Sequence, residues 1–222
     1  MSTSRPKEKR RYKMPSPSAA LTDRVIMEHI DEGSRVLDLG CGDGLLLSEL
    51  RRIKSAEILG VEMSRRAMIQ CMTAGVPVIQ ADLDLGLEDF PSQSFDFAVL
   101  SQTLQQVRHP HVILEEMLRV ANRALVVVPN FGHWRVRWNQ LLWGRAPVSS
   151  SERYQWYNTP NLHLMSMPDF RDLVDVVEGR IVKELAIIRG RAVEQAWAAN
   201  VRADSAVYIL ERKSADADAP LP

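Results

Sequence analysis

Two aspartates and three glycines are crowded into the run Asp38–Gly44, which is the part of the sequence best suited to holding a ligand. Gly40 and Gly42 allow positive φ values, and they let a ligand touch the backbone where a Cβ would block it. An apolar run precedes the loop and a helical pattern follows it, so the free N–H groups of a helix N-terminus should face the same ligand. The run therefore predicts a binding turn between a strand and a helix.

The charge of this turn distinguishes between the ligands that such loops bind. A dinucleotide-binding loop needs a third glycine at the sixth position, where this chain has Leu45. Asp38 precedes the loop and Asp43 lies within it, so a pyrophosphate would face two carboxylates. A Walker loop is excluded, because no Lys-Ser or Lys-Thr pair follows the glycines. S-adenosylmethionine has no phosphate and carries an ammonium and a sulfonium, which suit carboxylates.

Two further acids follow in an order that suits an adenosine ligand. Glu62 is expected at the end of the second strand, where a carboxylate can accept both ribose hydroxyls. A nicotinamide site uses the same device, and a solvated loop glutamate is the alternative. Asp82 follows the third strand and can accept the adenine amino group, while the backbone N–H of Leu83 meets a ring nitrogen. The assignment of an adenosine ligand depends on the order in which the glycine loop, Glu62 and Asp82 follow one another along the chain.

Alternating strand and helix patterns should bring these residues to one edge of a sheet. The expected strands are Arg35–Leu39, Glu57–Val61, Pro77–Ile79, Phe95–Leu100, Ala124–Val128, Ile181–Ile188 and Ala206–Glu211, and the expected helices are Asp43–Ile53, Ser64–Ala74, Pro110–Val120 and Met167–Val177. This alternation predicts an α/β fold with a doubly wound, mostly parallel sheet, whose ligands bind at the carboxyl ends of the strands. The connection between the last two strands is too short for a crossover helix, so they should add an antiparallel edge.

The segment Phe131–Ser166, after the fifth strand, interrupts this alternation. It contains four of the five tryptophans and is too long for a plain connector. The four rings are expected to form a small satellite core. The helical spacing of Trp134, Trp138 and Leu141 predicts a lid helix packed on the sheet edge. If that helix leaves an apolar face exposed, the face would be a docking surface.

Composition predicts one globular domain over residues 19–213, with the insertion at about 131–166. The chain has 222 residues, of which 45% are apolar and 25% charged. The basic tail 1–18 and the tail 214–222 are expected to be disordered.

Charge and residue content argue against several classes of protein. Lys plus Arg and Asp plus Glu number 28 each, so nothing calls for a nucleic-acid partner. Cys41 and Cys71 make neither a disulfide framework nor a metal cluster, and His133 and His163 are spaced too irregularly for a metal site. No apolar run approaches the ~20 residues that cross a bilayer, and no signal peptide is evident. We therefore expect a cytoplasmic protein without a membrane partner.

The glycine loop, Glu62 and Asp82 together resemble the class I S-adenosylmethionine-dependent methyltransferases, from Arg35 to about Val128. That resemblance implies a Rossmann-like fold and S-adenosylmethionine, or S-adenosylhomocysteine, as the bound cofactor. It assigns Asp38, Gly40 and Gly42 to the methionine portion, Glu62 to the ribose, Asp82 and Leu83 to the adenine, and Ser101 and Gln102 to the methyl-donor pocket. The predicted binding set also includes Cys41 and Met63.

The rest of the chain is similar to a narrower family, the methionine biosynthesis protein MetW. The matching runs are Gly33–Gly44, Gln80–Asp84, Ser101–Gln105, Pro129–Trp134 and Trp156–His163. Asn158 departs from the family pattern, in which Asp is expected. The resemblance implies a role in methionine biosynthesis beside a homoserine O-acyltransferase, which transfers either an acetyl or a succinyl group and which family members are thought to bind and support.

Two functions from different classes remain open. Methyl transfer is an in-line displacement that positioning can accelerate, so the site needs no obvious acid or base. Ser101–Thr103 differs from the loop of amino-methylating nucleic-acid enzymes, and His109 suits packing as well as a base role. One candidate is therefore an enzyme that methylates a small molecule or protein. The other is a binding subunit that contacts an acyltransferase through Phe131–Ser166, whose Trp, Tyr and Arg residues suit an interface.

Overall fold

The protein is described here by a computed structural model that covers residues 19–144, 146–147, 157 and 159–213. Its strands are β1 (Arg35–Leu39), β2 (Glu57–Glu62), β3 (Val78–Gln80), β4 (Phe95–Ser101), β5 (Ala121–Pro129), β6 (Gly179–Ile188), β7 (Arg191–Glu194) and β8 (Ser205–Arg212). Its helices are α1 (Ala19–His29), α2 (Leu45–Lys54), α3 (Arg65–Thr73), α4 (Pro110–Val120), α5 (Trp134–Trp143), α6 (Met167–Val176) and α7 (Ala199–Arg202), with short 3₁₀ turns η1 (Leu83–Leu85) and η2 (Leu104–Gln106). The tails that were expected to be disordered, 1–18 and 214–222, lie outside the described residues.

The strands form an eight-stranded sheet in the order β3-β2-β1-β4-β5-β8-β6-β7. Strands β1 to β5 run parallel, and β8 runs antiparallel to both β5 and β6. The predicted doubly wound, mostly parallel sheet is confirmed, and so is the pairing of its last two strands. The antiparallel strand β8 lies inside the sheet, because the short hairpin strand β7 occupies the edge beyond β6.

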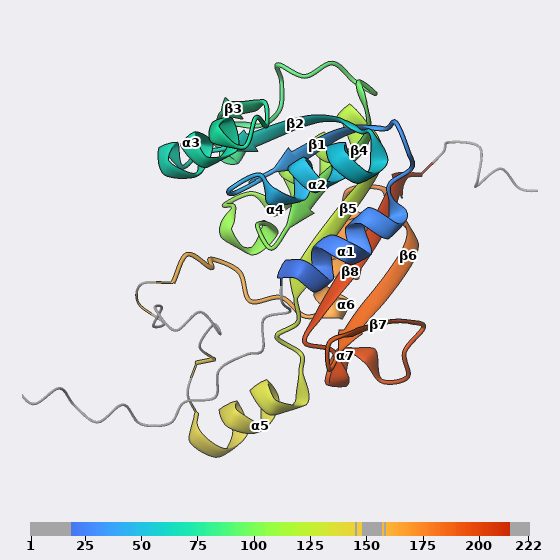
Figure 1. Cartoon of the computed structure of the whole chain (residues 1–222). Coiled ribbons are helices and arrows are strands. Elements are labelled where there is room, and N and C mark those ends of the chain that lie inside the picture. Colours follow the sequence, from blue (N-terminus) through green and yellow to red (C-terminus); the bar gives the residue numbers. More distant parts are fainter. Residues whose placement is uncertain (1–18, 145, 148–156, 158, 214–222) are drawn as a thin grey trace, which may run out of the picture.

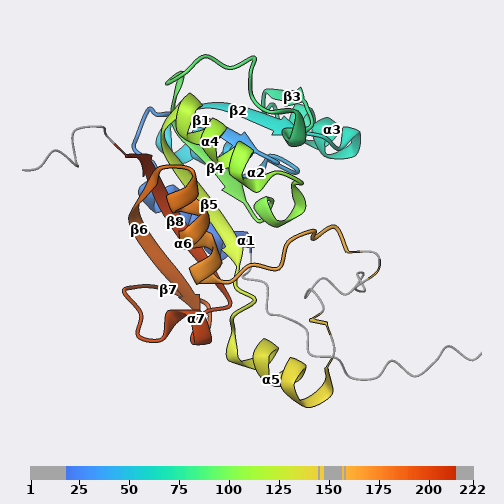
Figure 2. The ribbon, with the colours of Figure 1, turned by 180° about the vertical axis from the view of Figure 1, so that it is seen from behind.

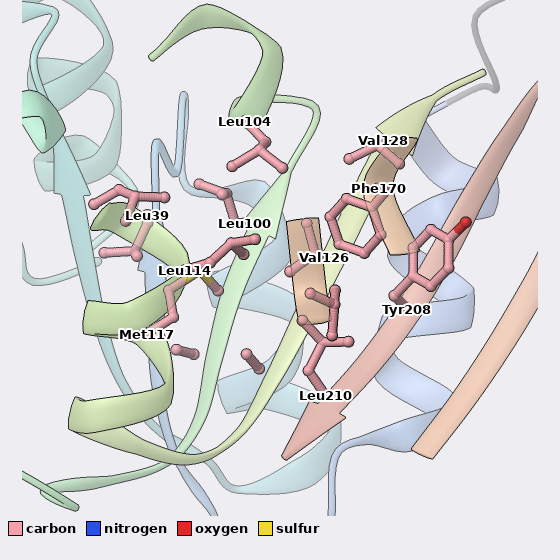
Figure 3. Packing of buried hydrophobic residues seen from close by; sticks show 14 of the residues in the cluster. Leu39, Leu100, Leu104, Leu114, Met117, Val126, Val128, Phe170, Tyr208 and Leu210 are labelled. Atoms are coloured by element: carbon pink, nitrogen blue, oxygen red, sulfur yellow. The ribbon is translucent and has the colours of Figure 1, made fainter. Parts of the chain in front are cut away.

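Helices cover both faces of this sheet (Figure 1). Helices α4 and α6 pack on one face, where Phe170 and Tyr208 place their ring centroids 4.2 Å apart among buried Leu100, Leu114 and Met117 (Figure 3). The other face is covered by α1, α2 and α3, and its core residues include Ile26, Leu47, Leu50 and Cys71. Burial on both faces explains the continuous apolar runs of the central strands.

The insertion after β5 contains the predicted helix, but the three tryptophans on that helix are not packed in the predicted satellite core. Trp134, Trp138 and Trp143 of α5 are 49%, 55% and 64% exposed, and Val136 is the helix's one buried side chain. Trp156 lies outside the described residues. In both views α5 stands apart from the sheet (Figures 1 and 2). The expectation of a lid helix packed on the sheet edge is therefore also wrong. Helical spacing of apolar residues predicts a helix without saying what covers it.

The end of the insertion lies against the main body of the fold. The backbone N–H groups of Leu162 and His163 both donate to the carbonyl of Gln105, at 2.8 and 3.1 Å. The His163 Nε2 atom lies 3.0 Å from the carbonyl of Val107. These contacts fasten the return segment across η2, directly after β4.

Candidate functional site

The loop between β1 and α2 has the glycine geometry that the sequence predicts. Gly40, Gly42 and Gly44 have φ values of 77°, 58° and 76°. A Cβ at Gly40 would lie 2.8 Å from Thr103 Oγ1, and a Cβ at Gly44 would lie 2.9 Å from Cys71 Sγ. A Cβ at Gly42 would meet nothing within 4 Å. Gly40 and Gly44 are therefore required by packing as well as by backbone conformation, whereas the backbone at Gly42 faces open space.

Hydrogen bonds from the loop to β2 place Glu62 beside these glycines. The N–H groups of Gly40 and Cys41 donate to the Val61 carbonyl at 2.8 and 3.2 Å. The Gly42 N–H donates to Glu62 Oε2 at 3.0 Å, and the Ser64 N–H donates to Oε1 at 2.7 Å. A carboxylate offers about four lone-pair sites, so each oxygen of Glu62 retains acceptor capacity for a hydroxyl. This is the acceptor pair that a ribose requires.

Two acidic side chains, one buried and one half-buried, lie behind the loop. Asp38 is 3% exposed, and its burial, followed by the charges of Asp23 and Glu62, raises its pKa to about 7. Burial and the charges of Asp43 and Glu49 raise the pKa of Asp23 to about 6. Every charged group that perturbs these two pKa values is itself acidic. A cationic ligand would stabilise the ionised forms, so the chemistry of this pocket fits an ammonium or a sulfonium.

The sequence did not identify Asp23 as a site residue. It lies on α1, whose buried residues Val25 and Ile26 pack in the core. The apolar spacing of this helix is a signal that could have predicted the helix. No motif indicates which of its polar residues faces the glycine loop, because α1 reaches that loop through tertiary packing.

The residues expected at the adenine lie at the ends of the neighbouring strands β2 and β3. Asp82 is exposed, and its Oδ1 accepts the N–H of Asp84 at 3.0 Å at the start of η1. Leu83 packs partly against the core. Gln80 Nε2 donates to the carbonyl of Met63 at 3.3 Å, which ties the two strand ends together. The exposed Met63 side chain leaves an apolar rim beside Glu62.

The loop after β4, expected at the methyl-donor end, is a strained turn. Gln102 has a φ of 57°, a left-handed conformation that costs energy for a residue with a Cβ. Thr103 Oγ1 donates to the Ser101 carbonyl at 3.1 Å and its side chain packs toward Gly40. The buried atoms Gln102 Nε2 and Gln105 Oε1 have no hydrogen-bond partner within the described part of the chain. Unpaired buried polar atoms beside a ligand loop are groups that a bound molecule can satisfy.

The strand order brings four of these loops to one edge. Strands β3, β2, β1 and β4 are consecutive neighbours, and they are parallel, so their carboxyl ends meet. Asp38, Gly40, Gly42, Glu62, Met63, Asp82, Leu83 and Ser101 all lie at or just beyond these ends. Cys41 is there too, with its sulfur buried 3.8 Å from that of Cys71, so its side chain packs in the core.

His133 makes structural contacts at the start of α5. His133 is buried, and its Nδ1 accepts the Arg135 N–H at 3.2 Å, at the start of α5. Its Nε2 lies 3.6 Å from Asp204, while burial lowers its pKa. His109 precedes the first residue of α4. Within the described ranges, no group of three or more His, Cys, Asp or Glu side chains is arranged to hold a metal ion. None of the helices in that part of the chain is both long and apolar enough to span a membrane.

Comparison with solved structures identifies the fold. The chain superposes on an S-adenosylmethionine-dependent methyltransferase from Thermotoga maritima with a TM-score of 0.64 at 18% identity, covering 88% of this chain and 89% of that one. It superposes on the cyclase SpnF with a TM-score of 0.61, also at 18% identity, covering 90% and 86%. At this level of identity the likeness shows a shared class I methyltransferase fold.

Sequence comparison identifies the family. Residues 22–210 match the family described as Methionine biosynthesis protein MetW. A bifunctional methionine biosynthesis protein MetXA/MetW from Rhodopirellula baltica is 34% identical over 203 residues, which are 86% of this chain and 33% of that protein. A ubiquinone biosynthesis O-methyltransferase from Paracidovorax citrulli is 30% identical over 96 residues, 40% of each chain. The chain thus spans a third to two fifths of the length of these relatives, and the match to the family covers nearly all of its described fold. The chain belongs to the MetW family of methionine biosynthesis proteins.

Proposed function

We propose that this protein binds S-adenosylmethionine or S-adenosylhomocysteine and supports a homoserine O-acyltransferase in methionine biosynthesis. The observation that carries the first half is the buried carboxylate of Asp38. Its pKa is raised to about 7 by burial and by Asp23 and Glu62, and it lies directly before a glycine loop. A nucleotide phosphate would add repulsion to this pocket, whereas the cationic end of S-adenosylmethionine would relieve it.

The remaining contacts suit the rest of the cofactor. Glu62 would accept the ribose hydroxyls with the lone pairs that Gly42 and Ser64 leave free. Asp82 and the backbone of Leu83 would hold the adenine, with Met63 at the rim. The cofactor supplies an electrophilic methyl group when it is bound, and the residues of this chain bind it, orient it and limit its exposure to water.

The support for an acyltransferase partner comes from the fused relative. The name of that protein joins MetXA to MetW, and this chain matches 33% of its length. We infer that its remaining part includes the acyltransferase. Fusion keeps two partners at equal number and high effective concentration, which is useful where the two must act in contact.

The second candidate is an active methyltransferase. It is favoured by the partial likeness to ubiquinone biosynthesis O-methyltransferases and by the unpaired polar atoms of Gln102 and Gln105, which could hold a methyl acceptor. The fold does not decide the question, because SpnF is named a cyclase.

Two measurements test these functions. The purified chain should bind S-adenosylmethionine in a calorimetric titration, and it should co-elute with the homoserine O-acyltransferase encoded in the same genome. Absence of binding in the titration would overturn the cofactor half of the proposal, and absence of co-elution would overturn the partner half. Turnover to S-adenosylhomocysteine with a defined acceptor, without any association with the acyltransferase, would establish the second candidate instead.

A further inference from the structure

Helix α5 presents an apolar surface that the described part of the chain leaves uncovered. Its large apolar side chains are exposed by 49% at Trp134, 55% at Trp138, 76% at Leu141, 51% at Leu142 and 64% at Trp143. A tryptophan presents about 150–250 Å², so three half-exposed rings already leave roughly 300 Å² of apolar surface facing solvent. Apolar patches of this size on soluble proteins are often binding sites.

The first turn of the helix is held by local hydrogen bonds. The Arg137 Nε atom donates to the Gly132 carbonyl at 2.6 Å, and His133 caps the first turn. Val136 is buried at its root, and the helix ends at Gly144 with a φ of 57°. A helix that is already formed and capped at both ends presents its exposed side chains with less ordering cost than an unstructured segment.

The spacing and charge of the exposed residues suggest how a partner would fit. Trp134, Trp138 and Leu141 recur at i, i+4 and i+7, the pattern of a helix that lies in an apolar groove. Arg135 stacks its guanidinium 5.3 Å from the ring centroid of Trp134. Between Trp134 and Trp143 the helix has two arginines and no acidic residue, so the partner's groove should have carboxylates at its rim.

A hollow at the root of the helix extends this surface. It has a volume of about 180 Å³, and its lining includes Val136, Gln140, Leu164 and Asp169. A protruding helix beside a hollow allows close shape complementarity with a partner that has a groove and a protrusion at the matching positions.

We propose that α5 is the docking helix for the homoserine O-acyltransferase, inserting Trp134, Trp138 and Leu141 into an apolar groove on that enzyme. This inference rests on the proposed function, and the fused relative supplies the occupant. A second copy of this chain is the alternative occupant, and the oligomeric state of the chain tests it. Helix α5 stands away from the glycine loop (Figures 1 and 2), so docking leaves the cofactor site free.

The experiment measures the dissociation constant between the full chain and the purified acyltransferase for a set of single variants. Trp138→Ala and Leu141→Ala should each weaken binding by about tenfold to a thousandfold, as truncation of interface anchors does. Arg135→Glu should weaken it as well, by opposing the carboxylates of the groove. Ile53→Ala, which removes an exposed apolar side chain from α2, is the matched control and should leave the dissociation constant unchanged. S-adenosylmethionine affinity should be unaffected in all four variants.

The outcomes separate this inference from the function on which it rests. If the unaltered chain does not bind the acyltransferase, the proposed function fails. If it binds and the α5 variants bind equally well, only the docking helix is wrong. The docking helix is also wrong if Trp138→Ala lowers the melting temperature, or if it dissociates a dimer in light scattering. Those results would show that the chain itself, or a second copy, covers α5.

Discussion

The glycine-loop edge and helix α5 differ in how they present their side chains. At the loop, the Asp38 side chain is almost completely buried, and the Glu62 carboxylate accepts hydrogen bonds from two backbone N–H groups. On α5, the large side chains point into solvent and only Val136 is buried. The first region is organised around charge and backbone geometry, which suit a small cationic ligand. The second offers apolar area, which suits a macromolecule.

Gly40→Ala should produce the largest difference between the two regions, because it should impair cofactor binding and spare acyltransferase binding. The substitution forces an alanine into a φ of 77° and places its Cβ 2.8 Å from Thr103 Oγ1. We expect the free energy of unfolding to fall by about 1–3 kcal/mol and cofactor binding to be largely lost, while acyltransferase binding by α5 persists in the folded fraction. Denaturant melts and calorimetry measure these effects.

Gly190→Ala is the matched control for that substitution. Gly190 has a φ of 74°, and a Cβ at this position would meet nothing within 4 Å. The residue lies in the turn between β6 and β7, away from the glycine loop. The variant should lose stability through backbone strain alone and keep its cofactor affinity. Equal loss of affinity in both variants would show that global destabilisation, and not the glycine loop, is being measured.

Glu62→Ala should weaken S-adenosylmethionine binding by roughly 1–3 kcal/mol, because charge-assisted hydrogen bonds to the ribose are lost. Glu57→Ala removes an exposed carboxylate from the start of the same strand and should have no such effect. Titration calorimetry compares the two. Parent-like binding by Glu62→Ala would mean that this carboxylate only ties the loop to β2.

Lowering the pH should weaken cofactor binding through Asp38. Its pKa of about 7 in the folded chain exceeds the value of about 4 for an unfolded aspartate. Folding of the ligand-free chain therefore favours the protonated Asp38 carboxyl. Its contribution to the free energy of unfolding is fully present below about pH 4 and is lost as the pH rises through about 7. A cation prefers the ionised form, so affinity should fall between pH 8 and pH 5, by at most tenfold per pH unit for one proton. Asp38→Asn should reduce this dependence, and a parent-like slope in that variant would rule out Asp38 as its source.

Trp138→Ala should barely change the stability of the free chain. Exposed side chains away from special features contribute within about 0.5 kcal/mol, and Trp138 is 55% exposed. Thermal melts should therefore be nearly superimposable. A loss above about 1 kcal/mol would indicate that Trp138 is packed, and the contrast between the two regions would no longer hold.

The sequence predicted the order of the fold and the placing of the candidate binding residues at one edge of the sheet, because both depend on local signals. Apolar runs located the strands, and the spacing of glycines and acids placed Gly40, Glu62 and Asp82 at the strand ends that the structure brings together. Strand β7 was not predicted, because a short exposed strand has little apolar pattern. Asp23 was missed because tertiary packing of α1, and no local motif, brings it to Asp38.

The exposure of α5 could not be predicted for a related reason. The spacing of Trp134, Trp138 and Leu141 correctly indicated a helix, and their hydrophobicity suggested that they would be buried. Burial depends on what surrounds a helix, and in the described part of the chain only the side of Val136 is covered. The same residues that looked like a core are therefore the best candidates for an interface.

Calorimetric titration of the purified chain with S-adenosylmethionine, and separately with NAD, tests the nature of the glycine-loop site most directly. Asp38, Asp23 and Glu62 should favour the cationic, phosphate-free ligand, so S-adenosylmethionine should bind and stabilise the chain by about 2.7 kcal/mol at a hundredfold excess over its dissociation constant. NAD should bind far more weakly. Equal affinity for NAD, or no heat and no change in melting temperature with S-adenosylmethionine, would contradict the assignment.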